Sequence, residues 1–263
     1  AVDRESLENP IQFPKNRGEH EMPADLGWLT DPERAWLDRF RYTKRRTEYL
    51  LRRWTAKHAV AAALGRPRET AALASIMIGN HPTGAPYALV DGAPLDGDIS
   101  ISDRAGWAVG LVGRGLSAVG IDLEIVEPRT DGFVSDFLTA DEQARVRALA
   151  NREAQDAAAN LYWSAKEAAL KVLRTGLRAD TRTVEVLPSQ AIRPDGWASL
   201  EVRHTPSGRV FPGWWRIDGV FVLTIAADDR SALAQAPPQV LADSADLTGA
   251  ELTHSWLANP VAW

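Results

Sequence analysis

The chain has 263 residues, of which 45% are hydrophobic and 25% are charged, and this composition is typical of a globular protein. Its 30 Lys and Arg and 35 Asp and Glu give a net charge of -5, which disfavours nucleic-acid binding because that function needs a basic surface. The absence of cysteine excludes disulfides, thiolate metal sites and a cysteine nucleophile. No apolar run approaches the ~20 residues that cross a bilayer, and the N-terminus has no signal-peptide pattern. We therefore expect a cytoplasmic protein that makes no membrane contact.

The first half of the chain begins with a polar, loop-like extension over residues 1–27. Thr30 and Glu33 then form an S/T-x-x-E capping box, which predicts a helix start, and a longer helix follows that contains the segment 54–57. Residues 98–112 predict a hairpin that turns at 104–106.

The second half repeats this order of elements. Residues 117–125 alternate as a strand does, Thr139 and Glu142 form a second capping box, and 152–173 is rich in helix formers up to a stop at Gly176. Further strands are predicted at 182–187, 198–204 and 214–226. The tail, 231–263, reads as irregular, with Trp256 and Trp263 as the residues that would dock it.

Two short segments recur at one spacing. Leu-Thr-Asp-Pro-Glu at 29–33 resembles Leu-Thr-Ala-Asp-Glu at 138–142, and Trp-Thr-Ala-Lys at 54–57 resembles Trp-Ser-Ala-Lys at 163–166, each 109 residues later. The alternative is coincidence between helices of similar composition. Duplication predicts an α+β fold of two similar halves related by a pseudo-twofold axis, with the active-site cleft between them. We set the halves at 28–115 and 116–230.

The strand at 117–125 carries the sharpest local feature. With a period of two, Gly120, Asp122 and Glu124 share one face. Two neighbouring carboxylates repel each other unless a cation lies between them, and Mg²⁺, which prefers oxygen ligands, suits that position. The alternative is a solvated strand face with two ordinary acids.

The second helix adds an acid and a base to this region. Glu167 and Lys171 are four residues apart and face the same way, which is equally typical of a surface ion pair. If they are functional, Glu167 completes the carboxylate set. The residue equivalent to Glu167 in the first copy is His58, so a metal site would be confined to the second half.

A cluster of cations interrupts this acidic chain. Their concentration predicts a local anion site, for phosphate in particular, unless they only line a solvated helix face. The cluster comprises Arg41, Lys44, Arg45, Arg46, Arg52, Arg53 and Lys57.

Together, Gly120-Ile121-Asp122-Leu123-Glu124 and Trp163-Ser164-Ala165-Lys166-Glu167-Ala168-Ala169-Leu170-Lys171 resemble the paired signature of the 4′-phosphopantetheinyl transferase superfamily. The resemblance extends over about residues 28–228 and includes four further segments. They are the basic helix around Lys44-Arg45-Arg46, the turn Gly84-Ala85-Pro86, the element Ser100-Ile101-Ser102-Asp103-Arg104, and Gly176-Leu177 after the signature helix. The duplicated, Sfp-like type of this superfamily is monomeric, so we expect a monomer.

The resemblance implies transfer of 4′-phosphopantetheine from coenzyme A to a serine of an acyl or peptidyl carrier protein, with release of adenosine 3′,5′-bisphosphate. By the same resemblance, Asp122, Glu124 and Glu167 would hold Mg²⁺ and Lys171 would stabilise the diphosphate. Either Glu167 or a water on the metal would accept the serine proton. Coenzyme A would be bound by Lys44, Arg46, Arg53, Pro86, Ser102, Asp103, Arg104 and Lys171.

Two positions depart from the family pattern. The family's histidine after Ser-x-Ser is Asp103 here, and the lysine of its Gly-Lys-Pro turn is Ala85. Both changes remove positive charge from the expected nucleotide pocket, and an aspartate there repels phosphate unless Arg104 or the basic helix compensates. They motivate the alternative of a weakly active or non-catalytic relative that binds coenzyme A or a carrier protein.

Overall fold

A computed structural model describes residues 11–13, 17–115, 118–228, 237–240, 244 and 246–252. It has an α+β fold, which confirms the predicted fold class. The chain divides into two compact units. Unit 1 comprises Ala1–Ser117, Pro238–Asp246 and Glu251–Trp263, and unit 2 comprises Ala118–Pro237 and Leu247–Ala250. No helix of the described ranges is long and apolar enough to span a bilayer.

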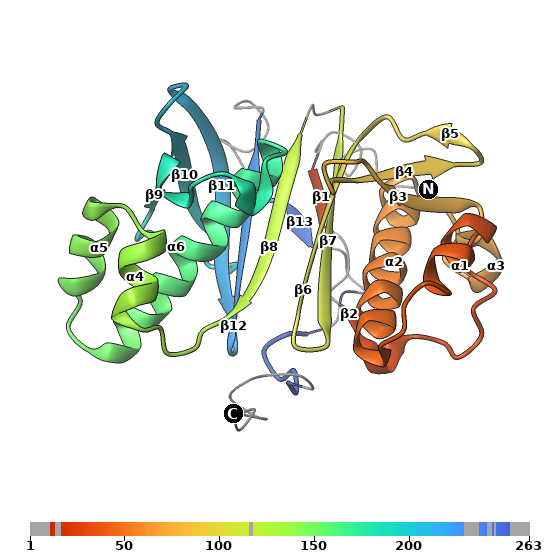
Figure 1. Ribbon diagram of the computed structural model, residues 1–263, viewed down its shortest axis with the longest axis horizontal. Coiled ribbons are helices and arrows are strands. Elements are labelled where there is room, and N and C mark those ends of the chain that lie inside the picture. Colours follow the sequence, from red (N-terminus) through yellow and green to blue (C-terminus); the bar gives the residue numbers. More distant parts are fainter. Residues whose placement is uncertain are drawn as a thin grey trace. The chain divides into compact units, whose positions relative to one another are not determined.

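Unit 1 combines two sheets with helices (Figure 1). In one sheet the strands run in the order β13-β1-β7-β2, with β6 also paired to β7, and the second sheet has the order β3-β4-β5. The long helix α2 contacts β7 and β3. The elements are β1 (Ile11–Phe13), β2 (Arg17–Gly18), a 3₁₀ turn (Glu19–Glu21), α1 (Asp31–Leu37), α2 (Thr43–Ala63), α3 (Thr70–Leu73), β3 (Ile76–Asn80), β4 (Pro86–Val90), β5 (Ala93–Pro94), β6 (Gly97–Arg104), β7 (Trp107–Arg114) and β13 (Gln239–Val240).

The predicted hairpin of unit 1 is confirmed as β6 and β7. Ala105 and Gly106 connect the two strands with φ of 53° and 84°, the left-handed conformation that tight hairpin turns require. The N-terminal extension differs from the loop predicted there, because β1 and β2 both pair antiparallel with β7. Strand β13 of the predicted irregular tail likewise pairs with β1, whereas Trp256 and Trp263 lie outside the described residues.

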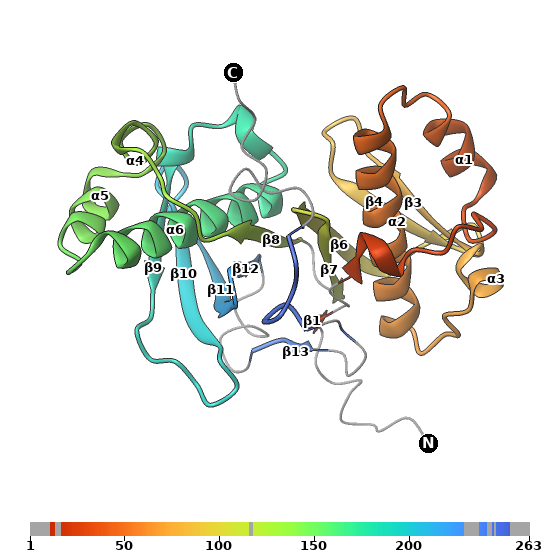
Figure 2. The same cartoon turned by 90° about the horizontal axis from the view of Figure 1, so that it is seen from below.

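Unit 2 is built on one antiparallel sheet with the strand order β8-β12-β11-β10-β9. Helix α6 packs against β8 and β12, and Figure 2 shows it along one face of this sheet. Its elements are β8 (Val119–Ile125), α4 (Asp131–Phe137), α5 (Ala140–Arg147), α6 (Arg152–Val172), 3₁₀ turns at Gly176–Arg178 and Thr181–Thr183, β9 (Val184–Pro188), β10 (Ala198–His204), β11 (Arg209–Asp218) and β12 (Phe221–Ala227).

Two local predictions in unit 2 need correction. Helix α6 ends at Val172, and the residue that leaves the helix in a left-handed conformation is Arg174, with φ of 59°, before Gly176 is reached. The predicted strand at 214–226 is two strands, because Gly219 turns the chain with φ of 58°. A turn with positive φ interrupts an apolar run without changing its hydrophobic pattern.

Candidate active site

The two motifs of unit 2 meet because one residue lacks a side chain. Gly120 of β8 faces α6, and a Cβ atom at this position would lie 1.9 Å from the backbone oxygen of Ala168. The backbone of the helix therefore occupies the space that a side chain at this position would need. Since side chains alternate along a strand, Asp122 and Glu124 face the same helix.

Three residues at successive turns of α6 face these acids. Trp163 donates from Nε1 to Glu124 Oε1 at 3.1 Å, and Lys171 donates from Nζ to Asp122 Oδ1 at 2.9 Å and to the Ile121 carbonyl at 2.7 Å. Glu167 lies one turn from each. A spacing of four residues along the helix covers about the same distance as a spacing of two residues along the strand. The side chains of the two motifs therefore face each other in one contact.

The carboxylates of this contact influence one another. Burial raises the pKa of Glu167 to about 8, and the negative charges of Asp122 and then Glu124 add to the effect, while Lys171 opposes it. Asp122 is almost fully buried, with 1% of its surface exposed. The metal-free protein therefore holds more carboxylate groups at this point than it can keep ionised at neutral pH.

The chemistry of these donors suits a magnesium ion. Three carboxylates supply the hard oxygen ligands that Mg²⁺ prefers, and a divalent cation would offset their mutual repulsion. Within the described ranges, however, no three His, Asp or Glu side chains are close enough together to enclose a metal ion. Side-chain rotation would be needed, in particular of Asp122 away from Lys171.

The site includes an arginine that the sequence did not indicate. Arg129, between β8 and α4, lies 3.8 Å from Glu124 and 3.3 Å from Glu127 as ion pairs. Its Nε donates to Asn160 of α6 at 2.7 Å, and its guanidinium lies 4.4 Å from the centre of the Phe133 ring. No motif contains Arg129, and only the tertiary structure brings it to Glu124.

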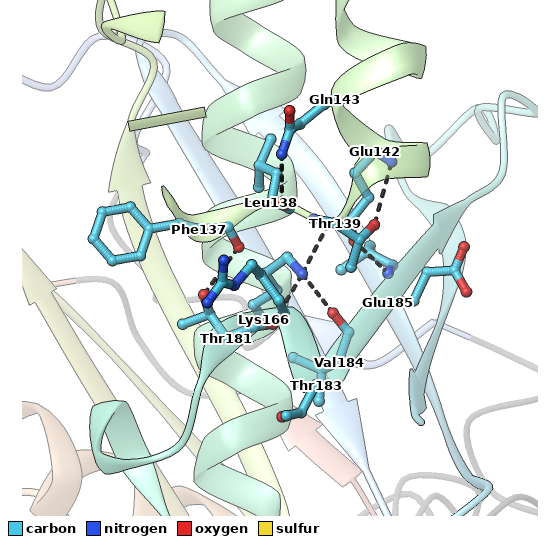
Figure 3. Close-up of polar contacts among 12 residues, drawn as sticks. Phe137, Leu138, Thr139, Glu142, Gln143, Lys166, Thr181, Thr183, Val184 and Glu185 are labelled. Carbon is cyan, nitrogen blue, oxygen red and sulfur yellow. Dashed lines mark hydrogen bonds and ion pairs between the residues drawn. The ribbon is translucent and has the colours of Figure 1, made fainter. Parts of the chain in front are cut away.

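The first lysine of the signature helix, Lys166, lies in the core of unit 2. Lys166 is fully buried, pairs with Glu142 at 2.8 Å, and donates to the carbonyls of Thr181, at 3.0 Å, and Val184 (Figure 3). Glu142 also accepts from the backbone of Thr139 and, at 2.7 Å, from that of Val186, which ties the start of α5 to β9. Lys166 thus stabilises unit 2 and does not face the acids of β8.

The predicted cations of unit 1 divide among several tasks. Lys44 is exposed and lies 3.9 Å from Glu48, and Arg46 donates to the carbonyl of Leu37 at the end of α1. Lys57 is buried against Glu33. Each of these three cations therefore has a partner within unit 1.

Arg53 is the member of this set that lines a cavity. The cavity of about 210 Å³ is lined in part by Trp36, Tyr49 and Tyr87. Arg53 is 6% exposed, its guanidinium lies 4.4 Å from the centre of the Tyr49 ring, and burial lowers its pKa. In the described part of the chain no carboxylate lies within ion-pair distance of Arg53, although Glu33 also lines this cavity.

Asn80 connects Arg53 to the predicted Gly84-Ala85-Pro86 turn. Its Oδ1 accepts from Arg53 at 2.5 Å, and its Nδ2 donates to the Gly84 carbonyl at 2.8 Å. The turn joins β3 to β4, and Pro86 is the first residue of β4. Two of the predicted coenzyme A contacts, Arg53 and Pro86, are thereby linked by a residue that the sequence did not indicate.

The remaining predicted residues of unit 1 lie at the end of β6. These are Ser102, Asp103 and Arg104. Asp103 forms an ion pair with Arg52 of α2 at 3.0 Å. The basic helix therefore supplies a counter-charge to the aspartate that replaces the expected histidine, which reduces its repulsion of a phosphate.

Comparison with known proteins identifies one match within the chain. Residues 118–212 match the family model of the 4′-phosphopantetheinyl transferase superfamily. The matched segment begins just before β8 and includes α6, so it contains both halves of the contact described above. No curated protein matches the chain.

Proposed function

The chain belongs to the 4′-phosphopantetheinyl transferase superfamily through residues 118–212, and on that premise we propose that it transfers 4′-phosphopantetheine from coenzyme A to a serine of an acyl or peptidyl carrier protein. The observation that carries this proposal is the contact of β8 with α6. In this contact Asp122 and Glu124 of the strand face Glu167 and Lys171 of the helix. Gly120 allows the strand and the helix to approach closely. Phosphoryl transfer depends on such a concentration of charged groups, because its transition state spreads charge over phosphate oxygens.

We assign Asp122, Glu124 and Glu167 as the residues that would hold Mg²⁺. When bound, the ion would supply charge neutralisation on the diphosphate of coenzyme A. Lys171 would bind a diphosphate oxygen through its ammonium group once it leaves Asp122. The cavity around Arg53 and the turn at Pro86 are our candidates for holding the nucleotide end of coenzyme A.

The reaction forms one bond and breaks one bond. The serine oxygen of the carrier protein bonds to the phosphorus of 4′-phosphopantetheine, and the bond from that phosphorus to the bridging oxygen breaks, which releases adenosine 3′,5′-bisphosphate. We propose that Glu167 accepts the serine proton, because the β8–α6 contact places this carboxyl group beside Asp122 and Lys171, where the diphosphate would be held. Such a base contributes typically about 10²–10⁴-fold to a rate.

Mass spectrometry of a carrier protein incubated with coenzyme A and Mg²⁺ tests the proposal. We expect a mass gain of one phosphopantetheine per carrier, and a loss of at least about 10²-fold in rate for Asp122→Asn. The matched control is Glu201→Gln, which changes an exposed acid of β10 and should leave the rate unchanged. Equal rates for both variants would contradict the assigned role of Asp122.

The alternative function is that of a relative that binds coenzyme A without transferring its phosphopantetheine. Asp103 is the residue that favours it, although its ion pair with Arg52 weakens the argument. Calorimetry that detects coenzyme A binding, with no mass gain on several carrier proteins, would support the alternative. A large rate increase for Asp103→His would show that the aspartate limits an active enzyme.

A further inference from the structure

Arg129 is held in position mainly by groups other than the acid of the site. Its Nε donates to Asn160 at 2.7 Å, its guanidinium stacks on Phe133, and its side chain is only 15% exposed. Asn160 is itself fixed, since its Nδ2 donates to the carbonyls of Glu127 and Asp156 at 2.7 Å. The guanidinium would therefore remain beside Glu124 whether or not that acid bound another cation.

Each acid of β8 consequently has its own cation. Lys171 lies 2.9 Å from Asp122, and Arg129 lies 3.8 Å from Glu124. A guanidinium does not lose its proton in a protein, so the positive charge of Arg129 is permanent. A divalent cation that approaches Glu124 alone must overcome the repulsion of this fixed charge, which Glu127, 3.3 Å from the guanidinium, reduces but does not remove.

We propose that Arg129 is a positioning residue that makes metal binding depend on an anionic diphosphate, the co-ligand that coenzyme A would bring. The diphosphate offsets the added positive charge, so the metal and the nucleotide bind with strong mutual dependence, and the metal alone binds weakly. This inference rests on the proposed function, because it takes Asp122, Glu124 and Glu167 as the metal site. Arg129 acts through its charge beside Glu124 and does not contact the reacting atoms.

Titration with Mn²⁺, followed by the electron paramagnetic resonance signal of the free ion, measures this dependence without turnover. We expect R129Q and R129M to bind Mn²⁺ alone about tenfold more tightly than the unmodified protein. We expect Mn²⁺ affinity in the presence of coenzyme A to be unchanged, so the increase in Mn²⁺ affinity that coenzyme A causes should fall about tenfold, and by linkage the increase in coenzyme A affinity that Mn²⁺ causes should fall equally. R129M keeps an apolar stem against Phe133 and serves as the second variant if R129Q folds poorly.

Two variants control for structural effects. R129K retains the charge and should bind Mn²⁺ as the unmodified protein does. R145Q removes an arginine in a comparable setting, 3.2 Å from Glu185 and 6.0 Å from the centre of the Tyr162 ring, and should also leave Mn²⁺ binding unchanged. If R129K behaves like R129Q, the charge is not the cause and the inference is overturned.

The failure of this inference is distinguishable from failure of the proposed function. If D122N binds Mn²⁺ as the unmodified protein does, or if no Mn²⁺ binds even with coenzyme A, the metal site itself is wrong. If D122N loses Mn²⁺ binding while R129Q and R129M bind it no more tightly than the unmodified protein, only the role of Arg129 is refuted.

Discussion

Each unit contains its own buried Glu–Lys ion pair, and the residues around the two pairs differ in their chemistry. In unit 1, Glu33 lies 2.7 Å from Lys57 and accepts from the backbone of Thr30 at 2.8 Å and of Ile78 at 3.0 Å. In unit 2, Glu142 lies 2.8 Å from Lys166 and accepts from the backbone of Thr139 and Val186. The repeated sequence segments therefore correspond to a repeated set of contacts, which argues against coincidence.

At a second pair of equivalent positions, the aromatic residue and the arginine are interchanged between the units. Trp36 and Arg53 line the cavity of unit 1, whereas the residues 109 positions later, Arg145 and Tyr162, line a cavity of about 540 Å³ in unit 2. Arg145 is neutralised by Glu185, but Arg53 has an amide, Asn80, as its partner. The two cavities therefore differ in the charge that their equivalent positions supply.

The largest effect is expected from breaking the repeated ion pair. K166M removes the partner of a fully buried Glu142 and should lower the free energy of unfolding by about 3–5 kcal/mol, measured by urea denaturation. K57M should cost a similar amount, because its surroundings match. A double variant, K166M with E142L, leaves no buried charge and should be more stable than K166M alone. A stability unaffected by K57M would contradict the equivalence of the two pairs.

The next effect is a dependence of stability on pH that arises in unit 2. It is caused by Glu167, whose counterpart in unit 1 is His58. A folded-state pKa raised from 4.5 to about 8 stabilises the metal-free protein below pH 4.5, and this stability is lost as the pH rises through about 8. We expect a loss on the order of 2 kcal/mol after allowance for partial exposure, seen in melting temperatures in chelator. E167Q, which remains neutral, should flatten this dependence. A wild-type profile with the same slope as E167Q would contradict the raised pKa.

A smaller effect is expected from adding one methyl group where β8 meets α6. G120A places a Cβ 1.9 Å from the Ala168 carbonyl oxygen, so backbone must shift, at a cost of about 1–3 kcal/mol. Activity should fall by more than stability does, because the shift moves Glu167 away from Asp122. Unfolding curves and transfer rates on the same sample measure both. G132A, where only a side-chain oxygen lies within 4 Å, is the matched control.

The smallest effect is expected at Arg53 of unit 1 and at Tyr162, its equivalent in unit 2. R53Q removes the guanidinium from the unit 1 cavity and should raise KM for coenzyme A about tenfold, with little change in kcat, because binding of the nucleotide end is uniform along the reaction. Y162F alters the equivalent residue of unit 2 and should leave both constants unchanged. A fall in kcat for R53Q without a change in KM would count against the nucleotide assignment.

The sequence predicted most accurately those features that depend on interactions between neighbouring residues. Both capping boxes form around Thr30 and Thr139, because a capping box depends on four consecutive residues. The bounds of α6 were predicted to within one residue, but the residue that ends this helix and the turn between β11 and β12 were not, since a left-handed residue such as Arg174 has no reliable sequence signal. Among the site residues, Asp122, Glu124, Glu167 and Lys171 were identified from their motifs, and their roles in binding metal and substrate stay predictions.

The sequence could not predict three features of the site, because each depends on contacts that the fold creates. They are the positions of Arg129 and Asn80 and the ion pair between Arg52 and Asp103. The sequence by itself determined the class of fold, the repeat and the acids of β8, because periodicity and capping act over a few residues. Tertiary structure decided which cations oppose those acids and which cations serve as helix caps or core pairs. The physical reason is that the interaction of a charge depends on its distance to other charges and on its burial, and folding sets both.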